Sequence, residues 1–199
     1  MKVLMMVPDD FMWPEYAQPR EIYEQAGVSV QIATKDGQTA NPDSRNYRDY
    51  SEAKPLESNL SFSEVEVDDF DAVTTVGGTG AWPDLIQNPK AHRVLAESLR
   101  KEKVTGLICA STGTLAMIEN FDDADTSLVK GRNVTGYYKV ENILRKVGEV
   151  NFVDGEADDV TVVVDGNLVT GRNPQSSELF GITVLEALQK SVSSSTHNE

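Results

Sequence analysis

Short, continuous apolar runs constrain the fold of this chain more than any other feature. The clearest is KVLMMV (2–7), and DAVTTV (71–76) and VTGLICA (104–110) are similar in length. Each predicts a strand, and an unbroken run such as KVLMMV is typical of a strand that is buried on both faces. Strands of this kind occur in parallel sheets whose two faces are covered by helices, so the runs favour an α/β fold.

Segments with helical spacing separate these runs and support the same fold class. One helix is expected to end near Gly27 and one to span 89–103, while 111–118 and 139–147 are further helical segments. The last helix is expected to begin after Pro174. Further strands are expected at 28–34 and 133–137, and in a hairpin around Asp165-Gly166. Strands that alternate with helices predict a mainly parallel sheet with helices on both faces.

The chain shows no repeat and no interdomain linker. We therefore expect one domain over 1–191 and a disordered tail over 192–199. Residues 35–63 are polar and are interrupted by two prolines. They predict a long excursion, with a short edge hairpin as one option, which either covers a pocket or contributes to an interface.

Composition narrows the function classes. The net charge of −14 opposes binding to nucleic acid or to an anionic membrane surface. A single cysteine permits no internal disulfide, and no apolar segment is long enough to span a membrane. We expect a cytoplasmic protein. Histidine and cysteine do not cluster, so neither a metal site nor a cofactor is expected.

The single cysteine, Cys109, ends one of the predicted strands and is followed directly by a helical pattern. Ligands of open parallel sheets bind at the carboxyl ends of the strands. Ala110 and Ser111 are small enough for a sharp turn, so the segment resembles a nucleophile elbow, and a helix N-terminus can lower the pKa of a thiol. The alternative is that Cys109 is a small buried apolar side chain, and this stretch alone favours neither interpretation.

Two other segments point toward the same edge of the sheet. The glycine-rich segment 77–80 follows a predicted strand. The backbone N–H groups of Gly78 and Ala110 would form an oxyanion hole if that strand lies beside the cysteine strand. Glu15 follows the first strand, where a buried carboxyl group would have a raised pKa. Taken alone, the glycines also suit a plain turn, and Glu15 also suits the first turn of an exposed helix.

The chain resembles the ThiJ/PfpI superfamily over nearly its whole length. The segments that carry the resemblance are PEYAQPREIYEQAG, DFDAVTTVGG, TGLICASTGTLAMI, GRNVTGYY and VVVDGNLVTGRNPQSSELFGITVLEAL. The resemblance implies a flavodoxin-like three-layer sandwich, of the class I glutamine amidotransferase type, with a reactive cysteine at the elbow. That role falls on Cys109, the acidic partner is Glu15, and the oxyanion donors are Gly78 and Ala110. It also implies a homodimer or higher homo-oligomer.

The chain departs from that family in its histidines. Protease-like members carry a histidine directly after the cysteine, where this chain has Ala110, and deglycase-like members carry one where this chain has Tyr137. His92 and His197 are expected to be solvated. A peptidase is therefore not favoured, because the leaving amine would lack its proton donor. Tyr137 is either a substrate contact or a packing side chain.

Two functions from different classes remain open. The first is a small-molecule hydrolase or a glyoxalase- or deglycase-type enzyme. It would act on a reactive carbonyl or an amide-like small molecule through Cys109 and Glu15. The second is a non-enzymatic oxidative-stress sensor or chaperone-like protein that uses the same cysteine.

Overall fold

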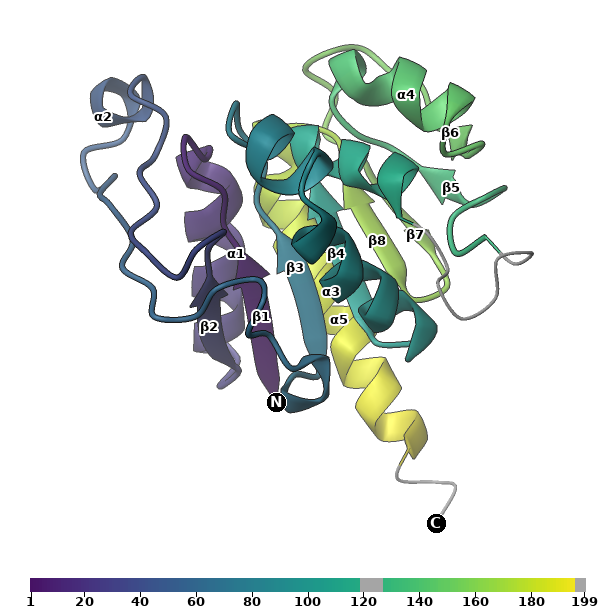
Figure 1. The fold of residues 1–199 in the computed structure, drawn as a ribbon, viewed down its shortest axis with the longest axis horizontal. Coiled ribbons are helices and arrows are strands. Elements are labelled where there is room, and N and C mark those ends of the chain that lie inside the picture. The colour runs from purple at the N-terminus through teal and green to yellow at the C-terminus, as the bar shows by residue number, and fades with distance from the viewer. Residues whose placement is uncertain (119–126, 196–199) are drawn as a thin grey trace.

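A six-stranded sheet forms the centre of the molecule (Figure 1). The computed structural model describes residues 1–118 and 127–195. The strand order is β2-β1-β3-β4-β8-β7, and every neighbouring pair is parallel except β7 with β8. The strands are β1 (Lys2–Met6), β2 (Ser29–Ala33), β3 (Ala72–Thr75), β4 (Val104–Ile108), β7 (Val162–Asp165) and β8 (Leu168–Gly171). The predicted mainly parallel α/β sheet is confirmed.

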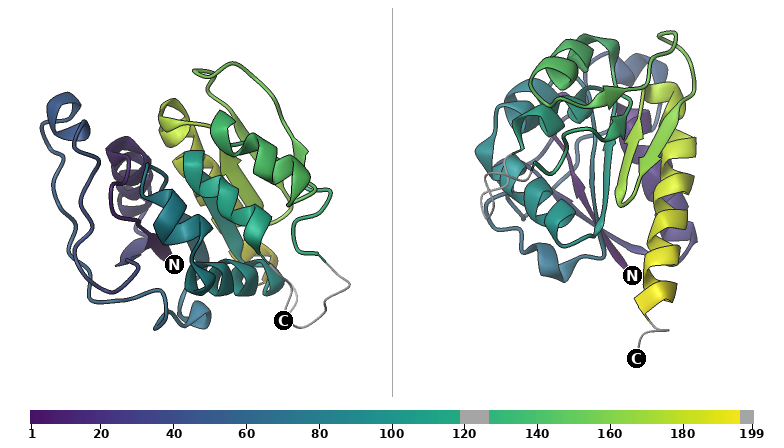
Figure 2. Two further views of the ribbon diagram at one scale, coloured as in Figure 1. Left: turned by 45° about the horizontal axis from the view of Figure 1, so that its top comes forward. Right: turned by 90° about the vertical axis from the view of Figure 1, so that its right-hand side faces the viewer.

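Helices cover both faces of this sheet, which confirms the three-layer arrangement (Figure 2). The face covered by α1 (Trp13–Gln25) and α5 (Ser177–Ser195) lies opposite the face covered by α3 (Pro89–Arg100) and the 3-10 helix η3 (Cys109–Met117). The remaining elements are short: α2 (Asn46–Asp49), η1 (Val67–Asp69), η2 (Trp82–Ile86), β5 (Asn133–Val134), η4 (Tyr138–Val140), α4 (Glu141–Lys146), β6 (Asn151–Phe152) and η5 (Pro174–Ser176). Strands β5 and β6 pair separately in a second, two-stranded sheet.

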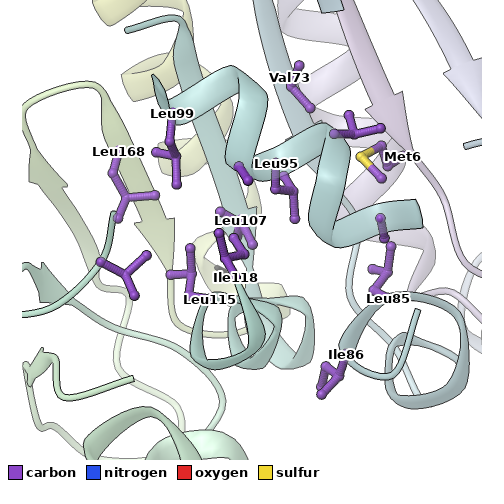
Figure 3. Close-up of a cluster of buried hydrophobic side chains, with 14 of the residues drawn as sticks. Met6, Val73, Leu85, Ile86, Leu95, Leu99, Leu107, Leu115, Ile118 and Leu168 are labelled. Atoms are coloured by element: carbon purple, nitrogen blue, oxygen red, sulfur yellow. The ribbon is translucent and has the colours of Figure 1, made fainter. Parts of the chain in front are cut away.

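Two hydrophobic cores explain why the interior strands have no polar alternation. Val3 and Met5 of β1 pack toward α1 and α5, whereas Leu4 and Met6 pack into the core beneath α3. Figure 3 shows the second of these cores, in which Leu95 and other side chains of the covering helices meet the strands. Both faces of β1 are therefore removed from water, as the run KVLMMV predicts.

The ends and the polar excursion differ in detail from expectation. Residues 192–195, expected to be disordered, continue α5, and residues 196–199 of that expected tail lie outside the described residues. The excursion 35–63 contains α2 and one reciprocal backbone pair between Ala40 and Leu56, at 3.0 and 2.8 Å, in place of a hairpin ladder. Within the described ranges, no helix is both long and apolar enough to cross a lipid bilayer.

Candidate functional site

Cys109 lies at a sharp turn between β4 and η3. Its backbone has a φ of +59°, a left-handed conformation that side chains other than glycine rarely adopt. The hydroxyl of Ser111 stabilises the turn, because Oγ donates to the carbonyl of Ile108 (2.6 Å) and accepts from its N–H (3.1 Å). Thr75, at the end of β3, donates to the same Oγ at 2.8 Å. The strand-to-helix elbow is present, and it is tied to the neighbouring strand.

Glu15 lies in the first turn of α1 and points beneath this elbow. Its side chain is 1% exposed, and Oε2 accepts a hydrogen bond from the backbone N–H of Gly77 at 2.9 Å. The carboxyl group also lies beside the Cys109 thiol, and each group shifts the pKa of the other: the thiol lowers the pKa of Glu15, and the carboxyl group raises the pKa of Cys109. Burial raises the pKa of Glu15 to about 8, so the carboxyl group is mostly protonated at neutral pH.

The thiol itself does not have the lowered pKa that the helix N-terminus predicts. Burial raises the pKa of Cys109 above its ordinary value, and the charge of an ionised Glu15 raises it further. The N–H of Ala110 acts in the opposite direction but is the smaller effect. The effect of burial and of the neighbouring carboxyl group on the thiol pKa therefore outweighs that of the backbone N–H groups. In the resting site both the Cys109 thiol and the Glu15 carboxyl group carry their protons.

The two glycines after β3 have different parts in the site. Gly78 has a φ of +121°, and a Cβ there would lie 2.4 Å from the carbonyl oxygen of Asp10. Gly77 was not among the site residues expected from the sequence. Its N–H holds Glu15, and a Cβ on it would lie 2.6 Å from Oε2 of Glu15 and 2.8 Å from the carbonyl oxygen of Ile108. Only glycine therefore lets the carboxyl group and the elbow approach this closely.

We expect G77A to destabilise the protein by about 1–3 kcal/mol, because the added methyl group overpacks the space between Glu15 and β4. Urea unfolding measures this change, and iodoacetamide alkylation shows whether the Cys109 site is displaced with it. G166A is the control, since a Cβ at that hairpin glycine meets no atom within 4 Å and only its φ of +56° is unfavourable. Equal stability of G77A and wild type would contradict the close approach.

A cavity of about 370 Å³ opens above the cysteine. Its size suits a small organic molecule. Gly78 and Ala110, the two expected oxyanion donors, both lie in its wall together with Cys109. The full lining is Met12, Arg45, Gly78, Thr79, Trp82, Ile86, Cys109, Ala110, Tyr137, Lys139, Val140 and Pro174. The excursion 35–63 thus contributes Arg45 to the cavity, a residue that has no recognisable motif in the sequence.

Tyr137 also lies in the cavity wall. Its backbone N–H donates to the carbonyl of Cys109 at 3.1 Å, which fixes the tyrosine beside the elbow. Burial and a hydrogen bond with Tyr138 raise the pKa of its hydroxyl to about 12, so Tyr137 stays a neutral hydrogen-bond donor at physiological pH. A tyrosine therefore lies in the wall of the cavity, next to Cys109.

The histidines do not complete this site. His92 was expected to be solvated but is buried, and one ring nitrogen lies 2.9 Å from the carbonyl oxygen of Ile86. The reason is η2, which the sequence did not indicate and which packs directly before α3. His197 lies outside the described residues. In the part of the chain that the structure describes, no histidine lines the cavity, and no three metal-ligating side chains come together.

Comparison with known proteins agrees with this architecture. A Bacillus subtilis protein, YraA, whose name describes a candidate cysteine protease, is 30% identical over 94% of this chain and 98% of its own length. The crystal structure of a ThiJ/PfpI domain protein from Brachyspira murdochii superposes with a TM-score of 0.78 at 25% identity, covering 95% of this chain and 96% of the other. Glyoxalase III from Candida albicans shares the fold, with a TM-score of 0.76 at 20% identity over 94% and 97% of the two chains. The sequence profile of the DJ-1/PfpI family matches residues 1–187. This chain belongs to the DJ-1/PfpI family.

Proposed function

We propose that this protein is an enzyme that converts a small 2-oxoaldehyde into a 2-hydroxy acid through Cys109 and Glu15. The observation that carries the proposal is the pairing, at the bottom of a ligand-sized cavity, of a thiol with a carboxyl group whose pKa is about 8. A carboxyl group tuned to that range can accept and return protons near neutral pH, which an exposed glutamate cannot do efficiently.

The first step is addition of the thiol to the aldehyde. The sulfur forms a bond to the aldehyde carbon while the carboxylate form of Glu15 accepts the thiol proton. The carbonyl π electrons move to the oxygen, where the N–H groups of Gly78 and Ala110 stabilise the charge until it is protonated. Because Glu15 removes the proton during the attack, the resting thiol does not need a low pKa.

The second stage isomerises the adduct without an external oxidant. After Glu15 has passed the thiol proton to the adduct oxygen, it removes the proton from the former aldehyde carbon and delivers it to the neighbouring carbon. The hydroxyl proton of the adduct passes to the oxygen of that neighbouring carbon, so a hemithioacetal becomes a thioester. Water then hydrolyses the thioester and restores the thiol. One carbon is oxidised and its neighbour is reduced within the same substrate, so no external oxidant is needed. The net change is the addition of one water molecule. Tyr137, which lies in the cavity wall, donates a hydrogen bond to the second carbonyl oxygen in this proposal.

The raised thiol pKa favours an enzyme over the sensor that the sequence left open. Oxidation to a sulfenic acid proceeds through the thiolate, and both burial and Glu15 suppress that form at Cys109. Peptide hydrolysis is less well supported, because no histidine lies in the described cavity wall to protonate a leaving amine.

Incubation with methylglyoxal in D2O tests the reaction class. We expect lactate to form at a rate above that of a protein-free control, with solvent deuterium at carbon 2 because the proton passes through an exchangeable carboxyl group. NMR detects both. Absence of lactate would overturn the proposed activity, and lactate without deuterium would overturn proton transfer through Glu15.

The pH profile provides a second prediction. Because the base form of Glu15 is required for attack and its pKa is about 8, kcat/KM should rise with pH and level off above about 8. E15Q should lose this rise together with most of the rate. Initial rates between pH 6 and 9 measure the profile. A wild-type rate that is flat over this range would contradict a general-base role for Glu15.

We propose a cytoplasmic homodimer or higher homo-oligomer that acts on a small molecule and binds neither nucleic acid nor membranes. Light scattering of the purified protein measures its oligomeric state.

A further inference from the structure

The cavity wall has a charge opposite to that of the rest of the chain. The sequence contains 32 acidic residues and 18 lysines and arginines. The cavity lining nevertheless includes two cations, Arg45 and Lys139, and among the described residues that form it there is no carboxylate. A positive wall in an acidic protein indicates that the occupant is negatively charged.

Lys139 is the less constrained of the two cations. Its Nζ lies 5.8 Å from the ring centroids of both Tyr137 and Tyr138, and no acidic partner for it is found in the described ranges. The aromatic rings hold the ammonium group near the cavity without neutralising its charge. A lysine that is exposed, positioned by two rings and has no counterion among the described residues is available to pair with an anionic group on a ligand.

Arg45 is held in a fixed orientation. Its Nε and Nη2 atoms donate to the two carboxylate oxygens of Asp43 at 2.9 and 2.6 Å, and this pairing lowers the pKa of Asp43 to about 2. Asp43 is itself buried and also accepts from the backbone N–H of Arg45 at 3.0 Å. Asp43 thus occupies Nε and Nη2, whereas Nη1 makes no hydrogen bond within the described part of the chain. The pair has no net charge, so it supplies an oriented donor while Lys139 supplies the charge.

We propose that the aldehyde substrate of Cys109 carries a carboxylate, which Lys139 binds as an ion pair and Arg45 binds through Nη1. This inference rests on the proposed function and names its substrate class: a 2-oxoaldehyde with a carboxylate at the far end of its carbon chain. The aldehyde lies at Cys109, between the N–H groups of Gly78 and Ala110, while the carboxylate lies toward the cavity mouth. The product is then a hydroxy diacid.

Alkylation of Cys109 tests this charge preference without requiring turnover. Iodoacetate and iodoacetamide displace iodide by the same chemistry and differ in one negative charge. The quantity to measure is the alkylation rate with iodoacetate divided by the rate with iodoacetamide. We expect this ratio to be about fivefold higher for Cys109 than for the free thiol 2-mercaptoethanol, which is the effect of a partly screened ion pair. High salt should reduce that excess, since the cations are exposed.

Two lysine variants decide whether Lys139 causes the preference. K139Q should lower the rate ratio toward that of 2-mercaptoethanol, whereas K90Q, which removes the same charge from an exposed position of α3 outside the cavity, should leave it unchanged. A wild-type ratio equal to that of 2-mercaptoethanol, or a ratio that K139Q does not change, would overturn the inference. R45Q is avoided as the first variant because it would leave the buried carboxylate of Asp43 without its partner.

Turnover then compares 4,5-dioxopentanoate, which carries the carboxylate, with the neutral 2-oxopentanal. Wild type should have the higher kcat/KM for the anionic compound by about fivefold, and K139Q should remove that advantage. If the alkylation preference is present but neither aldehyde reacts, the proposed activity fails and the anion site stands. If both aldehydes react equally well and alkylation shows no preference, the activity stands and the anion site fails.

Discussion

C109S should lower kcat/KM for methylglyoxal by at least ~10³-fold, because a serine hydroxyl is far less acidic and less nucleophilic than the thiol. The carboxyl group of Glu15 cannot compensate, since a base with a pKa of about 8 removes a hydroxyl proton much less readily than a thiol proton. The fold should be unaffected, because serine is similar in size and the turn is held by the hydroxyl groups of Ser111 and Thr112. Initial rates and thermal unfolding measure the two quantities.

M117A is the matched control for this substitution. Met117 ends the same 3-10 helix, is 38% exposed and lies outside the cavity, so its loss should leave turnover near the wild-type value. Residual activity in C109S within tenfold of wild type would show that the thiol does not form the covalent adduct. Equal loss in M117A and C109S would mean that disturbance of η3, and not removal of the nucleophile, explains the effect.

The folding stability of the wild type, measured relative to E15Q, should fall steeply as the pH rises from about 4.5 to about 8. The pKa of Glu15 is raised in the folded protein to about 8 from an ordinary value of 4.5. Below about pH 4.5 the Glu15 carboxyl group is protonated in both the folded and the unfolded state. Between about pH 4.5 and 8 it is protonated only in the folded state, so a rise in pH favours unfolding. The expected slope is roughly 1.4 kcal/mol per pH unit, which amounts to several kcal/mol over the interval, and above about 8 the difference levels off.

Urea unfolding at pH 5, 6, 7 and 8 measures this linkage, and subtraction of the E15Q curve removes the contribution of the other titrating groups. E21Q replaces an exposed glutamate of the same helix and should retain the wild-type dependence. A wild-type-minus-E15Q difference that stays constant with pH would mean that the Glu15 carboxyl group ionises normally in the folded state.

The elbow and its sheet could be predicted from the sequence because local signals specify them. The run before Cys109 marks a strand buried on both faces, and the small residues Ala110 and Ser111 permit the turn. Glu15 is different: its local pattern suits an exposed helix start equally well, and the resemblance to a known family, not its spacing, singled it out. Its burial depends on Gly77, which is 62 positions away in sequence and whose N–H binds it.

The cations of the cavity wall could not be predicted, because tertiary contacts place them. Arg45 belongs to an irregular excursion held by backbone bonds from Phe11 to Asn41 (3.3 Å) and from Asp43 to Phe11 (2.8 Å), which leave no periodic pattern. The prediction of a solvated His92 is wrong for a related reason. The π-helical segment before α3 has no simple hydrophobic period, so the sequence did not show that its last residue, Ile86, would bind the histidine ring.

The bond between Glu15 and Gly77 joins parts of the chain that leave the ribosome at very different times. Glu15 emerges early, its partner N–H appears 62 residues later, and Cys109 follows last, directly after β4, the strand that must pair with β3. Contacts this distant in sequence form only after the intervening chain has collapsed. A nascent chain that ends before β4 therefore contains Glu15 without its neighbouring thiol, and the two groups shift each other's pKa only when the sheet around them closes. The order of synthesis thus keeps an incomplete chain from assembling the site that joins Glu15, Gly77 and Cys109.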